Sequence, residues 1–220
     1  VIGVGSTWTL GSSFSTGQSF LVNFGAFNTD SYTCTVNNFT STGTGVRSLT
    51  LGASTVSATT SFNFGTSPGV VGNFLFNAGT SSVSCNNVSM TLDGNGQTFY
   101  NISFGNSAAT TFNITGANTF NTLSFVGRNS VGITFVTFNA NQTINTLTLN
   151  AGTAAAFRTF LASNTIGTTR TLTVGTLTAG AADIDFRDIT IAGAAAPVSG
   201  TRLGDAKGNS GITFGAGVTR

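Results

Sequence analysis

The sequence lacks histidine and glutamate and has few charges of either sign. Its 220 residues include only 8 lysines and arginines and 6 aspartates, so 6% of the chain is charged, against about 25% in an ordinary soluble domain. Without histidine or glutamate, histidine-dependent triads, zinc–histidine sites and two-glutamate glycosidase pairs are excluded. A net charge of +2 leaves too few cations to neutralise a phosphate backbone, so nucleic acid is not an expected partner.

Cysteines and long apolar runs are scarce as well. No run approaches about 18 consecutive apolar residues, so no membrane-spanning helix is predicted. Residues 1–5 lack the basic and apolar segments of a signal peptide, and they indicate an internal or processed start, as in a fragment of a longer polypeptide. Cys34 and Cys85 stand in no C-x-x-C motif, and we expect two small buried hydrophobic side chains whose disulfide state stays open.

The chain is nevertheless rich enough in apolar residues to fold. Hydrophobic residues make up 40% of it, and 20 residues are phenylalanine. Disordered chains have few aromatic and apolar residues, so the low charge does not indicate disorder. The length fits one domain or one continuous repeat structure.

Short runs that alternate between apolar and polar residues recur along the whole chain. Each run is bounded by glycine, asparagine or serine, which is the pattern of a half-buried β-strand. The clearest runs are 48–52, 61–65, 73–77, 111–116, 133–135 and 170–175. Helical periodicity is nearly absent, so the sequence predicts an all-β protein.

The strands repeat. Aligned on an asparagine followed by apolar, polar and apolar residues, segments 101–104, 121–125 and 145–149 superpose. Their first apolar residues are Ile102, Leu123 and Leu147, which gives steps of 21 and 24, and Leu172 follows at a step of 25. A recurrent period of this length, with two or three short strands in it, is typical of a solenoid.

Two further observations extend the repeat. A second strand begins about ten residues after the first in several repeats, at Phe112, Ile133 and Phe157. Near the end of the chain, Ile189 and Ile212 are separated by 23 residues. Asparagine and threonine at equivalent positions are expected to form side-chain ladders along the stack.

These patterns predict a β-solenoid, a parallel β-helix with coils of about 21–25 residues. A β-sandwich is the alternative, since it also has short strands and frequent turns. Three parts are expected: an irregular β part over 1–45, regular coils over 46–180 and less regular coils over 181–220.

The densest charge cluster lies in residues 183–191. In a strand, Asp183, Asp185 and Arg187 would share the outer face while Ile184 and Phe186 point inward. The alternation then shifts, which predicts a corner or bulge at 187–188. The simplest interpretation is a local ion pair. There are two functional alternatives: a calcium site using Asp183 and Asp185, or a carboxylate pair for glycoside cleavage.

Other polar segments are predicted to be structural. Residues 93–96 and 204–209 are expected to be turns, the second with Asp205 and Lys207 as a solvated ion pair. Trp8, Tyr32 and Tyr100 could stack on sugars, but they are scattered. The asparagines of the Asn-x-Ser/Thr sequences are expected to form side-chain ladders and not to carry glycans. They are Asn38, Asn87, Asn101, Asn113 and Asn141.

Segments 166–174, 185–193 and 204–214 together resemble a module of large repetitive bacteriophage proteins, such as tail fibres and other virion appendages. The preceding coils, rich in threonine, asparagine and phenylalanine, look like phage and bacterial-surface β-helices in general. The resemblance implies a structural or host-attachment role at the virion or cell surface. It carries over no catalytic residue.

The leading hypothesis is therefore a structural and adhesive segment of an extracellular assembly, a phage fibre or virion appendage. A bacterial adhesin or filament subunit is the second. A polysaccharide-degrading spike using Asp183, Asp185 or Asp205 is the third. We expect no enzyme activity, no cofactor and no resident metal. Few charged residues are available to prevent the strand edges from pairing with other chains. The expected partners are therefore further copies of the chain, with a surface glycan as a possible receptor.

Overall fold

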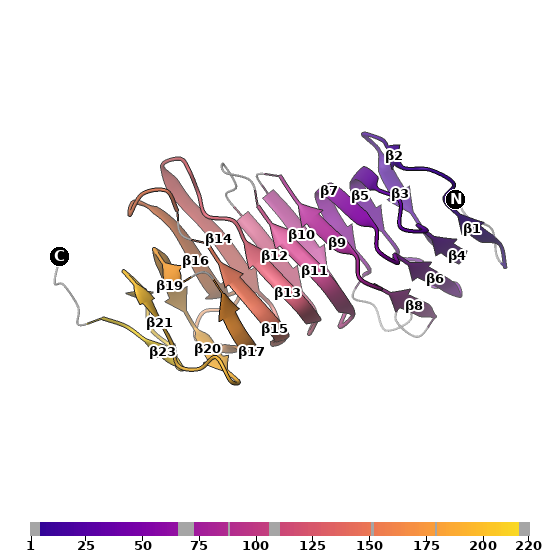
Figure 1. Cartoon of the computed structure of the whole chain (residues 1–220). Helices are drawn as coiled ribbons and strands as arrows, with labels where there is room; N and C mark the ends of the chain where they lie inside the picture. Colours follow the sequence, from indigo (N-terminus) through magenta and orange to yellow (C-terminus); the bar gives the residue numbers. More distant parts are fainter. Residues whose placement is uncertain are drawn as a thin grey trace.

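The chain folds into an elongated stack of parallel strands (Figure 1). The computed structural model describes residues 5–65, 73–87, 89–105, 111–150, 152–178 and 180–215, and all regular structure in these residues is β-strand. The strands form a β-solenoid of about 8 turns, which confirms the predicted fold. Parallel pairing such as that of β11 (Thr98–Phe104) with β13 (Thr119–Phe125) does not fit a β-sandwich, whose sheets are antiparallel. No helix that could cross a membrane occurs in the described ranges.

The strands are short because glycine, asparagine and serine end each apolar run. In chain order they are β1 Thr7–Thr9, β2 Phe14–Ser15, β3 Ser19–Leu21, β4 Gly25–Asn28, β5 Cys34–Thr40, β6 Arg47–Thr50, β7 Thr55–Asn63, β8 Phe74–Asn77, β9 Ser82–Cys85, β10 Ser89–Asp93, β11 Thr98–Phe104, β12 Thr111–Thr115, β13 Thr119–Phe125, β14 Gly132–Phe138, β15 Gln142–Leu149, β16 Phe157–Ser163, β17 Arg170–Thr178, β18 Ala181–Ala182, β19 Ile184–Arg187, β20 Ile189–Ala192, β21 Val198–Thr201, β22 Gly204–Asp205 and β23 Ile212–Thr213.

The strands form several faces of one stack. A 4-stranded sheet has the order β1-β4-β6-β8, and a 16-stranded sheet has two arms that meet at β7. One arm runs through β9, β11, β13, β15, β17 and β20, and the other runs through β10, β12, β14, β16, β19 and β22. Pairing of β5 with β7 and of β16 with β19 continues across residues 45 and 180, so the same stack extends through all three predicted parts.

The register confirms part of the predicted repeat. Ile102 pairs with Leu123 and Leu123 with Leu147, at the predicted steps of 21 and 24. The next step was predicted wrongly: Leu147 pairs with Leu177, 30 residues on, and not with Leu172. The error has a simple cause. The Thr-Leu-Thr pattern occurs twice in β17, at 171–173 and at 176–178, and the first copy mimics the repeat.

The last predicted step is also wrong. Thr190 bridges to Ser210, whereas Ile212 pairs with Val198, so Ile189 and Ile212 do not occupy equivalent positions. The loop between β20 and β21 places Val198 next to β23, and spacing alone does not reveal this path.

Phenylalanine rings form ladders along the core. Phe64 and Phe99 stack at a centroid distance of 5.9 Å, and Phe99 and Phe120 stack at 5.7 Å. Such offset stacks suit strands spaced about 4.8 Å apart. Cys34 and Cys85 are buried, as predicted, and both are free thiols. Burial raises the pKa of Cys34 to about 11 and that of Cys85 further.

Uncharged polar ladders run along the outside of the stack. Asn38 donates from Nδ2 to Ser19 Oγ at 2.9 Å and accepts from Ser61 Oγ at 2.8 Å. Asn113 accepts from Thr137, and Asn101 donates to Ser82, so the ladder prediction is confirmed for these three asparagines. Asn141 differs, because its Oδ1 accepts from the backbone N–H of Thr171.

Candidate functional site

Each carboxylate of the Asp183 and Asp185 pair is held by an arginine. Arg202 donates from Nε and Nη2 to the two oxygens of Asp183 at 2.6 and 2.7 Å. Arg158 donates in the same forked way to Asp185, both contacts being 2.6 Å long, and lies 3.5 Å from Asp183. The predicted local ion pair is the one between Arg187 and Asp188, at 3.6 Å, whereas Asp183 and Asp185 pair with arginines from outside the 183–191 segment. A calcium ion would have to displace these guanidinium groups to reach the carboxylate oxygens.

The two carboxylates do not share an outer face, which corrects the prediction. Asp183 is 1% exposed and precedes β19 with a φ of 59°, so it lies at a corner and not in the strand. Asp185 is half-buried on the outer side of β19, and Ile184 and Phe186 point inward as predicted. The left-handed backbone at Asp183 turns its side chain away from the outer face.

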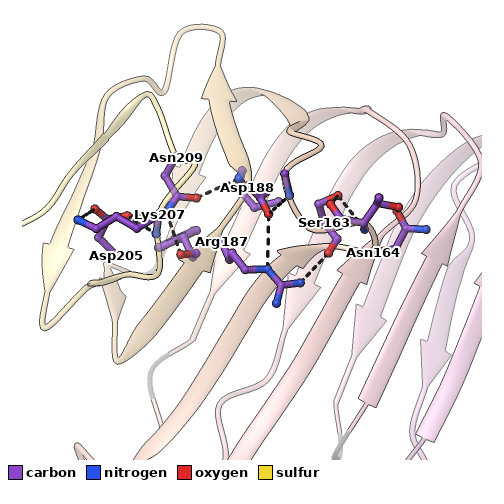
Figure 2. A network of polar contacts seen from close by, with 11 residues as sticks. Ser163, Asn164, Arg187, Asp188, Asp205, Lys207 and Asn209 are labelled. Carbon is purple, nitrogen blue, oxygen red and sulfur yellow. Dashed lines mark hydrogen bonds and ion pairs between the residues drawn. The ribbon is translucent and has the colours of Figure 1, made fainter.

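The predicted corner at 187–188 is confirmed and is the centre of a polar network (Figure 2). Asp188 has a φ of 55° and accepts from the backbone N–H of Gly167 at 3.0 Å. Arg187 donates to the Ser163 carbonyl at 3.1 Å, and Asn209 Oδ1 accepts from the Ile189 N–H at 2.9 Å. These contacts join neighbouring turns of the solenoid.

Asp205 lies in the predicted turn beside this network. Its carboxylate accepts from Asn209 Nδ2 at 2.8 Å and lies 3.4 Å from Lys207 Nζ, whose side chain is exposed. The Asn209 amide and Lys207 lower the pKa of Asp205, and the Arg202 guanidinium lowers the pKa of Asp183. A general acid for glycoside cleavage needs the opposite shift, because it must stay protonated.

The 93–96 segment is a turn, as predicted. Asn95 and Gly96 have φ values of 50° and 76°, and the Gln97 N–H donates to the Gly94 carbonyl at 3.0 Å. Burial raises the pKa of Asp93, which precedes the turn and is 9% exposed. The sequence predicts the turn but not the burial of the Asp93 carboxyl, and this burial keeps the carboxyl out of reach of a polymer substrate.

The first turns of the solenoid end in an apolar hollow. A cavity of about 450 Å³ is lined by Trp8, Leu10, Phe14, Phe20 and Phe27, among others. Trp8 is 58% exposed. The described residues therefore leave the N-terminal end of the core open, in contrast to the charged corner at the other end.

A second hollow lies on the arm that contains β11, β13 and β15. This amide groove has a volume of about 460 Å³ and is lined by side chains that include Phe76, Asn77, Thr98, Tyr100, Asn121 and Asn145. Of the three aromatic residues suggested as sugar platforms, Tyr100 is the one that lies here. Tyr32 does not line either hollow, and Trp8 lies at the open end.

The opposite arm carries an apolar surface that we call the lateral patch: Val131, Ile133, Phe135 and Phe160. Val131 is 83% exposed, Ile133 40% and Phe135 43%. Phe135 on β14 pairs in register with Phe160 on β16, and their ring centroids lie 5.6 Å apart. On the neighbouring strand β12 the outward residues are Thr111, Asn113 and Thr115, so the apolar side chains of the patch differ from the polar surface beside them.

The patch arises from β14, a strand with apolar residues on both of its faces. In β14, Ile133 and Phe135 have one phase, and Val136 and Phe138 have the other. The structure buries the second pair, because Val136 pairs with Phe112 and Phe138 with Ile114, both core residues. The predicted start of a second strand at Ile133 is confirmed to within one residue, since β14 begins at Gly132. Alternation alone leaves open which of the two sets faces inward, because a slip of one residue exchanges the two faces.

Charged residues border the lateral patch on the side of the C-terminal turns. Arg158 pairs in register with Ile133, and Asp185 pairs with Phe160. The Arg187 guanidinium lies 5.7 Å from the centroid of the Phe160 ring. Aromatic residues with a polar, arginine-containing rim are typical of protein–protein interfaces.

Comparisons with protein-family models, with curated proteins and with solved structures found no match. Function therefore has to be inferred from the two surfaces, the lateral patch and the amide groove. Neither was predicted as a unit, since each combines residues from neighbouring turns. The signal in the sequence for the patch was the doubled alternation of β14.

Proposed function

We propose that this chain is a structural and adhesive segment of an extracellular assembly, of the phage-fibre or virion-appendage kind, in which copies associate side by side. The observation that carries the proposal is the lateral patch. Exposed aliphatic and aromatic side chains on the outer face of an otherwise polar sheet are stabilised when a partner covers them. A bacterial surface filament with the same fold is the alternative setting.

The architecture supports a mechanical role. Each turn is joined to the next by strand pairing, core stacking and polar ladders, which makes a stiff rod. Its acidic side chains at the C-terminal turns are engaged by arginines, lysine and asparagine, so the proposal assigns them to holding turns together and assigns no catalytic step to the chain.

Replacing Phe135 with aspartate is expected to dissociate the assembly. The change places a carboxylate at the centre of the lateral patch, where it would have to be buried without a partner. We expect the wild-type chain to sediment as a multimer of the 22.3 kDa subunit, and Phe135→Asp to raise the dissociation constant by at least about 30-fold, as for an interface hot spot. Sedimentation velocity over a concentration series measures this.

The matched control is Leu75→Asp. Leu75 is another outward apolar strand residue, 70% exposed, on β8 and away from the patch. It should leave the sedimentation profile unchanged. A wild-type chain that remains monomeric at 100-micromolar concentrations (about 2 mg/ml), or equal effects of the two substitutions, would contradict the proposal.

A further inference from the structure

The amide groove is built from one repeating position of the solenoid. Between β11 and β13, Phe99 pairs with Phe120, and the following pair is Asn101 with Thr122. Tyr100 and Asn121, which lie between these pairs, are left out of the register. The next two pairings skip Asn121, Asn145 and Gly175 in the same way. Tyr100, Asn121, Asn145 and Gly175 therefore form a row along the stack with one residue in each turn.

The amides of this row are held in place by their neighbours. Asn121 donates from Nδ2 to Asn101 Oδ1 at 3.4 Å, and Asn145 donates from Nδ2 to Asn121 Oδ1 at 3.4 Å. Asn121 Nδ2 also donates to Thr122 Oγ1 at 3.5 Å, so both of its protons have partners and Asn121 can bond a further hydroxyl only as an acceptor at Oδ1. The bond from Asn145 uses one of the two protons on its Nδ2. Asn145 is exposed, and the glycine that follows it in the row adds no side chain, so its remaining hydrogen-bonding capacity faces solvent.

An aromatic ring begins the same row. Tyr100 is 36% exposed and lines the groove beside Asn77 and Thr98. A ring face offers contact to an apolar C–H surface, while amide and hydroxyl groups nearby exchange hydrogen bonds with hydroxyls. The residues that line the groove include no lysine, arginine or aspartate, so the groove offers no charge to an ionic ligand.

We propose that the amide groove binds a neutral oligosaccharide, with a pyranose ring against Tyr100 and its hydroxyls hydrogen-bonded to Asn145 and Asn121. The volume of about 460 Å³ lies within the range of small-molecule sites, roughly 300–1,000 Å³. The inference deepens the proposed adhesive function and rests on it, since it names the class of receptor. Because β13 and β15 already have strand partners on both sides, a peptide could not add there as a further strand.

Titration calorimetry and saturation-transfer NMR with the full chain test the proposal. The probes are maltohexaose, cellohexaose and fully N-acetylated chitohexaose, with hexagalacturonate as the anionic comparison. We expect at least one neutral hexasaccharide to bind and hexagalacturonate not to bind. Tyr100→Ala should raise the dissociation constant about tenfold and Asn145→Ala about threefold, whereas Tyr100→Phe, which keeps the ring, should stay within about twofold.

Trp8→Ala is the control, because Trp8 is an exposed aromatic residue outside the groove. It should bind like wild type. Failure of all three neutral probes, equal binding of hexagalacturonate, or unchanged binding by Tyr100→Ala would overturn the proposal. Sedimentation of the same samples separates the two proposals: a multimer that binds no glycan refutes the groove alone, and a monomer that binds refutes the side-by-side assembly alone.

Discussion

Replacing Phe99 with alanine is expected to lower the free energy of unfolding by about 3–5 kcal/mol, the usual cost of emptying a buried phenylalanine site. Phe99 is 1% exposed, and its ring contacts four others. The centroid distances are 6.1 Å to Phe62, 5.9 Å to Phe64, 5.2 Å to Phe76 and 5.7 Å to Phe120. Phe62, Phe76 and Phe120 lie in strands and Phe64 directly follows β7, so the backbone holds these rings in place and the cavity cannot collapse easily.

The position of Phe99 adds a second expectation. Each turn of a solenoid contacts only its neighbours, so a weakened central turn uncouples the two ends. Denaturant unfolding should become broader or biphasic, and amide exchange should rise first in β9, β11 and β13. Leu75→Ala, at an exposed apolar position, should change the free energy of unfolding by less than about 0.5 kcal/mol. A single unshifted transition in Phe99→Ala would show that the ring ladder does not couple the turns.

Replacing Asp183 with asparagine is expected to cost about 2 kcal/mol at neutral pH. The change keeps the size of the side chain and its tolerance of the left-handed backbone, but it removes the charge held by Arg202 and Arg158. Breaking a fully buried pair costs about 3–5 kcal/mol, and the cost is smaller here because the Arg202 side chain is half exposed and can be hydrated.

This cost should depend on pH. Hydrogen bonding from Arg202 lowers the pKa of Asp183 in the folded state, whereas an aspartate in the unfolded chain titrates near about 3.9. The carboxylate therefore adds stability above about pH 4, and the advantage of wild type over Asp183→Asn is lost as the pH falls through the lower folded pKa. Thermal denaturation from pH 7 down to pH 2 measures it.

Asp30→Asn is the matched control for this series. Asp30 is an exposed aspartate with a similar backbone, at a φ of 48°. Its substitution should leave stability nearly unchanged at pH 7, since the side chain is exposed. If Asp183→Asn lost the same stability at pH 2 as at pH 7, its effect would come from shape and not from charge.

The regular part of the fold was predictable because equivalent positions of successive turns carry side chains of the same kind. An asparagine followed by apolar, polar and apolar residues recurs in β11, β13 and β15, with one intervening residue in the last two, and the pairs Ile102–Leu123 and Leu123–Leu147 follow from this pattern. Prediction failed where two segments match the pattern equally well, as in β17, or where a loop takes up extra residues, as before Val198.

The candidate sites were less predictable, because each depends on the register between turns or on the backbone geometry of a corner. Asp183 and Asp185 have the spacing of neighbours on one strand face, but a left-handed residue at the corner separates their directions. Ile133 and Phe135 look like core residues until the register with Phe112 places them outside. Tyr100 looked isolated, since its row mates Asn121 and Asn145 are more than 20 residues away in the chain.

The scarcity of charge and the period of apolar residues were enough to establish an uncharged, stacked β-structure, because strand formation and inward burial depend on local alternation. Phase, register and corner geometry came from the folded molecule. Either set of alternating residues in a strand can face the core. The observed phase is the one that buries the larger apolar surface against the neighbouring turns. That phase places the lateral patch outside, register aligns the amide groove along one row, and corner geometry brings Arg202 and Arg158 to Asp183 and Asp185.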